Sequence, residues 1–168
     1  MPAGLLEGFR VLDMGSGISG PWCAKLLADY GADVIKLEIP GRGDDARRMG
    51  PFAGDDPDTE KSLTFLYLNT NKKGVTLDPS AASGRRLLER LVAEADVLVE
   101  NNPPSRSREL GLDYESLAET NPGLVLTSIT PFGQTGPYND FEATDIVTYA
   151  LSGLMYHSGD SDQPPLRN

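Results

Sequence analysis

Short apolar runs alternate with longer stretches of mixed polarity along most of the chain. The runs at residues 10–14, 33–38, 95–100 and 123–129 are strand-like, and the third contains a continuous apolar run, as expected of a strand covered on both faces. The segment GVTLD at 74–78 is a further, short strand candidate. Strand-like runs that alternate with helical patterns predict an α/β domain with a mainly parallel sheet flanked by helices.

Helices are expected between the strands, at residues 21–30, 80–95, 114–119 and 144–154. Pro21 suits a first helical turn, because its fixed φ fits there and its missing N–H is not needed, and Gly31 suits a helix stop. Helical spacing predicts one buried face on each of the first two helices. The first face consists of Cys23, Leu26 and Leu27, and the second consists of Leu87, Leu88 and Leu91. Residues 39–60 are long and polar for a connection, so they are expected to be functional or mobile.

The sequence GSGISG at residues 15–20 fits the pattern G-x-G-x-x-G and joins the first strand to the first helix. Glycines let a backbone approach a ligand closely, and a helix N-terminus presents unpaired N–H groups, so the amides between Met14 and Trp22 are expected to cradle a phosphate. Glu38 follows Gly20 by 18 residues, near the position of a ribose-binding acid. An NAD-dependent Rossmann enzyme is therefore one interpretation, and glycines that only permit tight strand–helix packing are another.

Charge and composition narrow the classes of partner. A net charge of −10 argues against a nucleic-acid partner, although backbone N–H groups and a few local cations can still hold a phosphorylated ligand. No apolar run approaches the roughly 18 residues of a membrane span, and the first residues show no secretory signal. Cys23 is the only cysteine and allows no intramolecular disulfide, so a cytoplasmic setting without membrane or metal is expected. The cations that could serve a phosphate are Arg42, Arg47, Arg48, Lys72, Lys73, Arg106 and Arg108.

Five segments in order carry a recognisable set of motifs. The first is LLEGFRVLDMGSGISGPWCAKLLADYGADVIKLEIPGRGDDAR, and the others are LNTNKKGVTLD, ADVLVENNPPS, LGLDYESLAETNPGLVLTSITPFGQTGPY and DIVTYALSGLMYHSGDSDQPPLR. Together they resemble the motifs of the class III coenzyme A transferases, the family that includes formyl-CoA transferase and carnitine CoA-transferase. The resemblance implies that residues 1–168 are the CoA-binding, N-terminal portion of a Rossmann-like large domain, and that the C-terminal half of the family fold is absent.

The resemblance also implies a reaction, the transfer of CoA from an acyl-CoA to a carboxylic acid. An aspartate of the family attacks the thioester, which gives a mixed anhydride and free CoA thiolate, and CoA then passes to the acceptor through an enzyme-bound thioester. This aspartate follows the PP-x-R segment in the family, so it is expected beyond Asn168, and the chain alone is expected to be inactive. Asp145 is expected to cap or begin a helix instead.

By the same resemblance, seven positions are expected to contact CoA: Gly17, Ile18, Ser19, Arg47, Leu77, Asn101 and Asn102. Arg47 lies in the GD…R loop and is expected to pair with a phosphate. Asn102 stands where the family usually has an aromatic residue, and Ile39 stands where formyl-CoA transferases have an arginine. The related acyl-CoA racemases need a histidine before the aspartate at 145, where this chain has Thr144, so racemase activity ranks low.

The partners implied are an acyl-CoA, a carboxylic acid, and either a second copy of the chain or another chain that supplies the missing half. One alternative remains from another class: a non-catalytic nucleotide-binding or assembly module, such as one half of a split or pseudo-enzyme. The sequence names neither the acyl group nor the acceptor acid.

Overall fold

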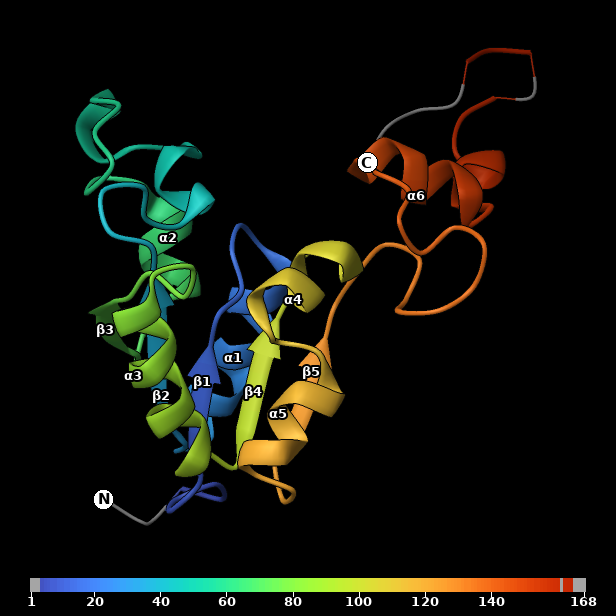
Figure 1. The fold of residues 1–168 in the computed structure, drawn as a ribbon. Helices are drawn as coiled ribbons and strands as arrows, with labels where there is room; N and C mark the ends of the chain where they lie inside the picture. Colours follow the sequence, from blue (N-terminus) through green and yellow to red (C-terminus); the bar gives the residue numbers. More distant parts are fainter. Residues whose placement is uncertain (1–3, 161, 165–168) are drawn as a thin grey trace. The chain divides into compact units, whose positions relative to one another are not determined.

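The computed structural model describes residues 4–160 and 162–164 (Figure 1). The chain divides into two compact units, Met1–Ile129 and Thr130–Asn168, and each is described by itself. Within the described ranges, no helix combines the length and the apolar character needed to cross a membrane.

In the described part of the first unit, five strands form one parallel sheet, which confirms the predicted α/β, Rossmann-like class. The strands are β1 (Arg10–Asp13), β2 (Asp33–Glu38), β3 (Lys73–Thr76), β4 (Val97–Glu100) and β5 (Val125–Ser128), in the order β3-β2-β1-β4-β5. The chain runs outward from β1 to β3 and then returns to β4, so the strand order reverses between β1 and β4. Open α/β sheets bind their ligands at the carboxyl ends of strands at such a reversal.

Helices cover both faces of this sheet, with α1 behind it and α3 and α5 in front in Figure 1. On one face, α1 (Ser19–Asp29) packs through Ala24 and Ala28 against β1, β2 and β4. On the other face, α3 (Ala82–Ala93) and α5 (Tyr114–Thr120) cover a core of leucines that includes Leu12 and Leu98. Neighbouring residues of one strand serve opposite faces, because side chains alternate along a strand.

The buried faces of two helices differ from those predicted. In α1, Ala24 is fully buried, whereas Leu26 is 41% exposed. In α3, Leu88 is buried as predicted, whereas Leu87 is 47% exposed. The alanines of α1 let the helix lie close to the sheet. Leu26, on which the predicted apolar face was based, therefore points partly outward.

The connections contain short elements that the sequence pattern only partly predicts. The loop after β2 holds two 3₁₀ turns, Asp45–Arg48 and Ala53–Asp55, and ends in α2 (Leu63–Leu68). Residues after β4 leave the strand as predicted, but they form a helix, α4 (Pro104–Leu110), that the pattern did not predict. Pro104 suits the first turn of this helix, because no partner is needed for its missing N–H there.

The second unit contains α6 (Asp145–Leu151) and a 3₁₀ turn, Leu154–His157. Asp145 lies in the first turn of α6, as predicted, and Thr144 is the N-cap residue. Before α6, the rings of Phe132, Tyr138 and Phe141 contact one another, with centroids 5.2 to 6.4 Å apart.

Candidate functional site

A cavity of about 470 Å³ lies at the carboxyl ends of β1, β2 and β4, where the strand order reverses. Its walls come from the turn after β1, the loop after β2, the loop after β4 and helix α4. The lining residues are Met14, Gly15, Ser16, Leu37, Glu38, Ile39, Arg42, Gly43, Asp44, Asp45, Asn101, Asn102, Pro103, Arg106 and Leu110. Position and volume are those of a small-molecule site in an open α/β sheet.

The amides at the start of the glycine turn are already hydrogen-bonded within the chain. The Gly15 N–H donates to Asp13 Oδ1 (3.0 Å), and the Gly17 N–H donates to Asp44 Oδ1 (2.8 Å). Between them, the Ser16 N–H donates to Asn101 Oδ1 (2.7 Å). Side-chain oxygens of the chain itself therefore accept from the first three amides of the predicted phosphate cradle, and contact between Gly17 and CoA stays a prediction.

The later part of the turn is open. Ile18 is 58% exposed, Ser19 is exposed, and within the described residues the amides of Ile18 and Ser19 have no hydrogen-bond partner, whereas Gly20 is buried. These free donors at the start of α1 are what a helix N-terminus offers to an anion. Gly17 precedes them with φ +75, a left-handed conformation that favours glycine.

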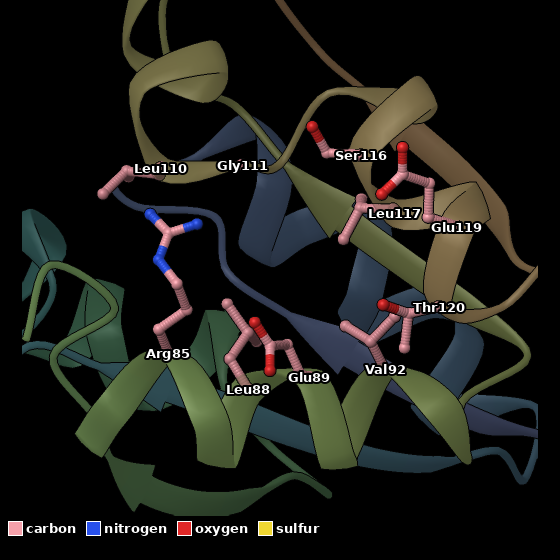
Figure 2. Close-up of a pocket in the computed structure, with 10 residues that line it drawn as sticks. All are labelled: Arg85, Leu88, Glu89, Val92, Leu110, Gly111, Ser116, Leu117, Glu119 and Thr120. Carbon is pink, nitrogen blue, oxygen red and sulfur yellow. The ribbon is translucent and has the colours of Figure 1, made fainter. Parts of the chain in front are cut away.

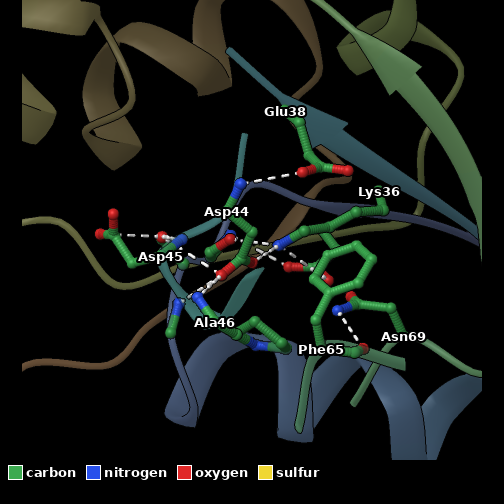
Figure 3. A network of polar contacts seen from close by, with 12 residues as sticks. Lys36, Glu38, Asp44, Asp45, Ala46, Phe65 and Asn69 are labelled. Carbon is green, nitrogen blue, oxygen red and sulfur yellow. Dashed lines mark hydrogen bonds and ion pairs between the residues drawn. The ribbon is translucent and has the colours of Figure 1, made fainter. Parts of the chain in front are cut away.

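Four buried charged side chains lie beneath the turn, and we call Asp13, Lys36, Asp44 and Lys72 the buried charge quartet. Lys36 Nζ lies 2.6 Å from Asp44 Oδ2 and 3.6 Å from Asp13 Oδ2, and it also donates to the Gly15 carbonyl oxygen (Figure 3). Lys72 Nζ lies 2.7 Å from Asp13 Oδ2. Burial lowers the pKa of Lys72, and the charge of Asp13 opposes this shift. Two positive charges thus balance two negative ones in a region closed to water.

Arg47 and Glu38 form a second ion pair beside the quartet. Arg47 donates to both Glu38 oxygens, from Nε (2.7 Å) and Nη2 (2.9 Å), and its Nη1 donates to Glu60 (2.8 Å). The guanidinium also lies over the Phe65 ring, 3.7 Å from its centroid. Hydrogen bonding from Arg47, with a further bond from the Asp44 N–H, lowers the pKa of Glu38.

The ion pair between Arg47 and Glu38 limits what either side chain can offer to a ligand. Glu38, considered as a ribose-binding acid, already accepts bonds on both of its oxygens. Arg47, predicted to meet a phosphate, is tied to two carboxylates and does not line the cavity. Contact between Arg47 and CoA stays a prediction.

The two asparagines after β4 connect that strand to the turn and to α4. The Asn101 side-chain amide donates to the Ser16 carbonyl oxygen (2.8 Å) and to Ser19 Oγ (3.1 Å). Asn102 donates to Glu100 Oε2 from its backbone N–H (2.8 Å) and its side chain (2.9 Å). Both asparagines line the cavity, and Asn101 holds the glycine turn next to it.

Leu77 lies apart from these residues. Its side chain is 9% exposed and belongs to the core, and it lines a separate apolar groove of about 300 Å³ between β3 and α3. Of the seven predicted contacts, Asn101 and Asn102 line the cavity. Gly17, Ile18 and Ser19 lie in the adjoining turn, where Ser19 accepts from Asn101, and neither Arg47 nor Leu77 lines the cavity.

Two arginines that line the cavity, Arg42 and Arg106, were not among the predicted CoA contacts, because the sequence showed them only as members of clusters of positive charge. Arg42 lies in the loop after β2, and Arg106 lies in α4 and pairs with Glu109 (2.9 Å). Arg106 could have been singled out only by predicting α4, which carries it to the cavity. In the described part of the chain, no group of three or more His, Cys, Asp or Glu side chains could hold a metal ion.

Another hollow, of about 260 Å³, lies between α3 and the α4–α5 region (Figure 2). Arg85 reaches from α3 toward Gly111, and its guanidinium donates to the Glu109 carbonyl oxygen (3.4 Å). Glu89 and Glu119 lie on the same rim. Two carboxylates therefore accompany the single arginine at this hollow. The carboxylates at the strand-end cavity, by contrast, are each paired with a cation: Glu38 with Arg47, Asp44 with Lys36 and Asp45 with Arg48.

Comparison with known proteins agrees with this geometry. Residues 6–168 match CoA-transferase family III. A succinate–glutarate CoA-transferase of Agrobacterium fabrum is 43% identical over 164 residues, which cover 96% of this chain and 41% of that protein. The subunit BbsE of a succinyl-CoA:(R)-benzylsuccinate CoA-transferase of Thauera aromatica is 44% identical over 157 residues, which cover 93% of this chain and 38% of that protein.

A solved structure shows the same fold. The crystal structure of a CAIB/BAIF family protein from Brucella suis superposes with a TM-score of 0.89 at 38% identity, and covers 99% of this chain and 44% of that one. This chain therefore spans about two fifths of the length of the curated relatives it matches. By its sequence motifs, its fold and the match over residues 6–168, the chain belongs to CoA-transferase family III.

Proposed function

We propose that this chain supplies the CoA-binding portion of an enzyme that transfers CoA from an acyl-CoA to a carboxylic acid. The observation that carries the proposal is the cavity at the carboxyl ends of β1, β2 and β4, which two arginines line. Family membership supports CoA as the ligand, because the relatives with printed activities are CoA transferases.

The phosphates of CoA need donors that the protein has not already used. Amides at the start of the glycine turn are bonded to Asp13, Asn101 and Asp44, so they are not available. The donors that remain are the free amides of Ile18 and Ser19 and, at the cavity, the further N–H groups of two arginines. Arg106 uses Nη1 to pair with Glu109 (2.9 Å), and Arg42 Nη2 lies 3.5 Å from Asp45. Arginine suits phosphate because its planar fork of N–H groups matches two phosphate oxygens.

In this proposal the described residues bind and orient CoA, and the nucleophilic carboxylate is the family aspartate expected beyond Asn168. Attack of that carboxylate on the thioester carbon forms a mixed anhydride and releases the CoA thiolate. The thiolate then attacks the enzyme-side carbonyl of the anhydride, which releases the first acid and leaves CoA bound to the enzyme as a thioester. The acceptor carboxylate attacks this thioester, which forms a second mixed anhydride and releases the CoA thiolate again. The thiolate finally attacks the acceptor-side carbonyl, which gives the new acyl-CoA and frees the enzyme carboxylate. A cavity that holds the CoA portion in place makes each return of the thiolate an intramolecular step.

Assembly with a second chain in the cytoplasm belongs to the same proposal. The name of the Thauera aromatica relative, a subunit, supports such an arrangement. Sedimentation equilibrium of the purified chain tests it: a monomer at every concentration would argue against association between copies of this chain.

Isothermal titration calorimetry with CoA, NAD and NADP tests the ligand. In a phosphate-free buffer of low ionic strength, we expect the chain to bind CoA and to bind neither NAD nor NADP. Arg106→Ala is expected to weaken CoA binding about tenfold, because one charge-assisted hydrogen bond is lost. Arg90→Ala is the matched control, since Arg90 is an exposed arginine on α3. A wild-type chain that releases no heat with CoA, or binds NAD equally well, contradicts the proposal.

A further inference from the structure

The glycine turn of this chain is filled by a carboxylate of the chain itself. Asp44 follows β2 in sequence, yet its Oδ1 accepts the N–H groups of Gly17 (2.8 Å) and Ala46 (2.7 Å). Its other oxygen, Oδ2, lies 2.6 Å from Lys36 Nζ. Asp44 and Lys36 are each 2% exposed, so water does not compete for these contacts.

The partners of this carboxylate are those of an anion-binding site. Two converging backbone N–H groups and one ammonium group bind phosphate or sulfate in many proteins, and a glycine with positive φ gives the backbone the required curvature. Gly17 has this conformation, with φ +75. The carboxylate of Asp44 thus stands where a ligand phosphate stands in a dinucleotide-binding fold.

The same residue also connects three parts of the cavity wall. Its side chain holds the turn after β1, its backbone N–H donates to Glu38 Oε2 (2.8 Å) at the end of β2, and it is the N-cap of the 3₁₀ turn Asp45–Arg48. Loss of the carboxylate would release the loop after β2 from the turn.

We propose that Asp44 is an internal anion that closes the start of the glycine turn to ligand phosphates and positions the loop after β2 against it. Asp44 is then a positioning residue that touches no substrate. Its effect on CoA binding rests on the proposed function, whereas its role as an internal anion does not.

Chemical rescue of Asp44→Ala tests this role. The substitution removes a carboxylate and leaves the Lys36 ammonium group and two N–H groups around an empty volume of about one carboxylate. Formate, HCOO⁻, has the charge and size to fill it. Thermal unfolding followed by circular dichroism is expected to show a lower Tm for Asp44→Ala, and a Tm that rises by several degrees and saturates as sodium formate replaces sodium chloride at constant ionic strength.

Two variants separate rescue from a general effect of formate. Asp44→Asn keeps an oxygen that can accept the two N–H bonds but loses the negative charge, and its side chain fills the volume, so formate is expected not to raise its Tm. Asp113→Ala removes a half-buried aspartate that caps α5 by accepting from Ser116, and this site lies apart from the buried Lys36 ammonium group. It is expected to lose stability without recovery in formate, and the wild type is expected not to respond.

The outcomes distinguish this inference from the proposed function. The inference is supported if the Asp44→Ala protein is unfolded in sodium chloride and folds in sodium formate. A saturating rise in the Tm of this variant with formate concentration supports it equally. Asp44→Ala that stays unfolded, or whose Tm rises no more than that of Asp113→Ala, overturns it. CoA titrations are run in parallel, and weaker binding by Asp44→Ala that formate restores is expected. A wild-type chain that does not bind CoA contradicts the proposed function and leaves the rescue result standing.

Discussion

Replacement of Lys36 by methionine removes one charge from the buried charge quartet and keeps most of the side-chain volume. Asp44 then loses its ion-pair partner at 2.6 Å, while Lys72 still pairs with Asp13. Breaking a buried pair from one side costs about 3–5 kcal/mol, because a charge is left without a partner. A domain of this size is stable by about 5–15 kcal/mol, so Lys36→Met is expected to lose a large fraction of its stability.

Urea denaturation followed by circular dichroism measures this loss. With a slope of about 2 kcal/mol per molar urea, the midpoint is expected to fall by roughly 1.5–2.5 M. Lys73→Met is the matched control, because Lys73 lies on the neighbouring strand, is 71% exposed and pairs with Asp33 at 2.6 Å. An exposed pair contributes at most about 1 kcal/mol.

A second substitution sharpens the result. Asp44→Asn added to Lys36→Met removes the carboxylate that has lost its partner, so part of the lost stability is expected to return. If Lys36→Met unfolds at the same urea concentration as Lys73→Met, the Lys36–Asp44 pair does not stabilise the fold.

Three further outcomes follow from single residues. Gly17→Ala forces a side chain into a left-handed backbone, and is expected to lower the free energy of unfolding by about 1–2 kcal/mol in the same urea assay; an unchanged midpoint would show that the turn relaxes. Arg47 lowers the pKa of Glu38, so the stability from this pair is present above the unfolded pKa of about 4.3 and is lost as pH falls through the folded value. Wild type is therefore expected to lose stability on acidification below pH ~5 more steeply than Glu38→Gln, and parallel curves would contradict this. Burial raises the pKa of Cys23, so iodoacetamide is expected to react slowly at neutral pH and much faster in urea, and equal rates in both would be the wrong result.

The strands were predictable because their signal is local. Residues 33–38 and 95–100 are apolar runs bounded by polar turns, and the strands in the structure, Asp33–Glu38 and Val97–Glu100, agree within two residues. Family motifs added the identity of the fold. Helix faces were less predictable, because α1 buries alanines and leaves Leu26 partly exposed, a choice that tertiary packing makes.

The candidate site was predictable in place and not in detail. The pattern G-x-G-x-x-G located the turn correctly, but it cannot show that Asp44, 27 residues after Gly17, occupies that turn. Lys36 lies among the apolar residues of an ordinary strand sequence. Nothing in the neighbouring residues indicates that its side chain is 2% exposed and paired with Asp44. Arg106 reaches the cavity only because α4 begins at Pro104, soon after β4 ends at Glu100.

The position of CoA on the chain is the central claim, and amide chemical shifts measured by NMR during a CoA titration test it most directly. We expect the largest changes at Asn102 and Arg106, which line the cavity at the strand ends, and at Ile18 and Ser19 in the adjoining turn. Changes confined to the groove between β3 and α3, at residues such as Leu87 and Arg90, would contradict it.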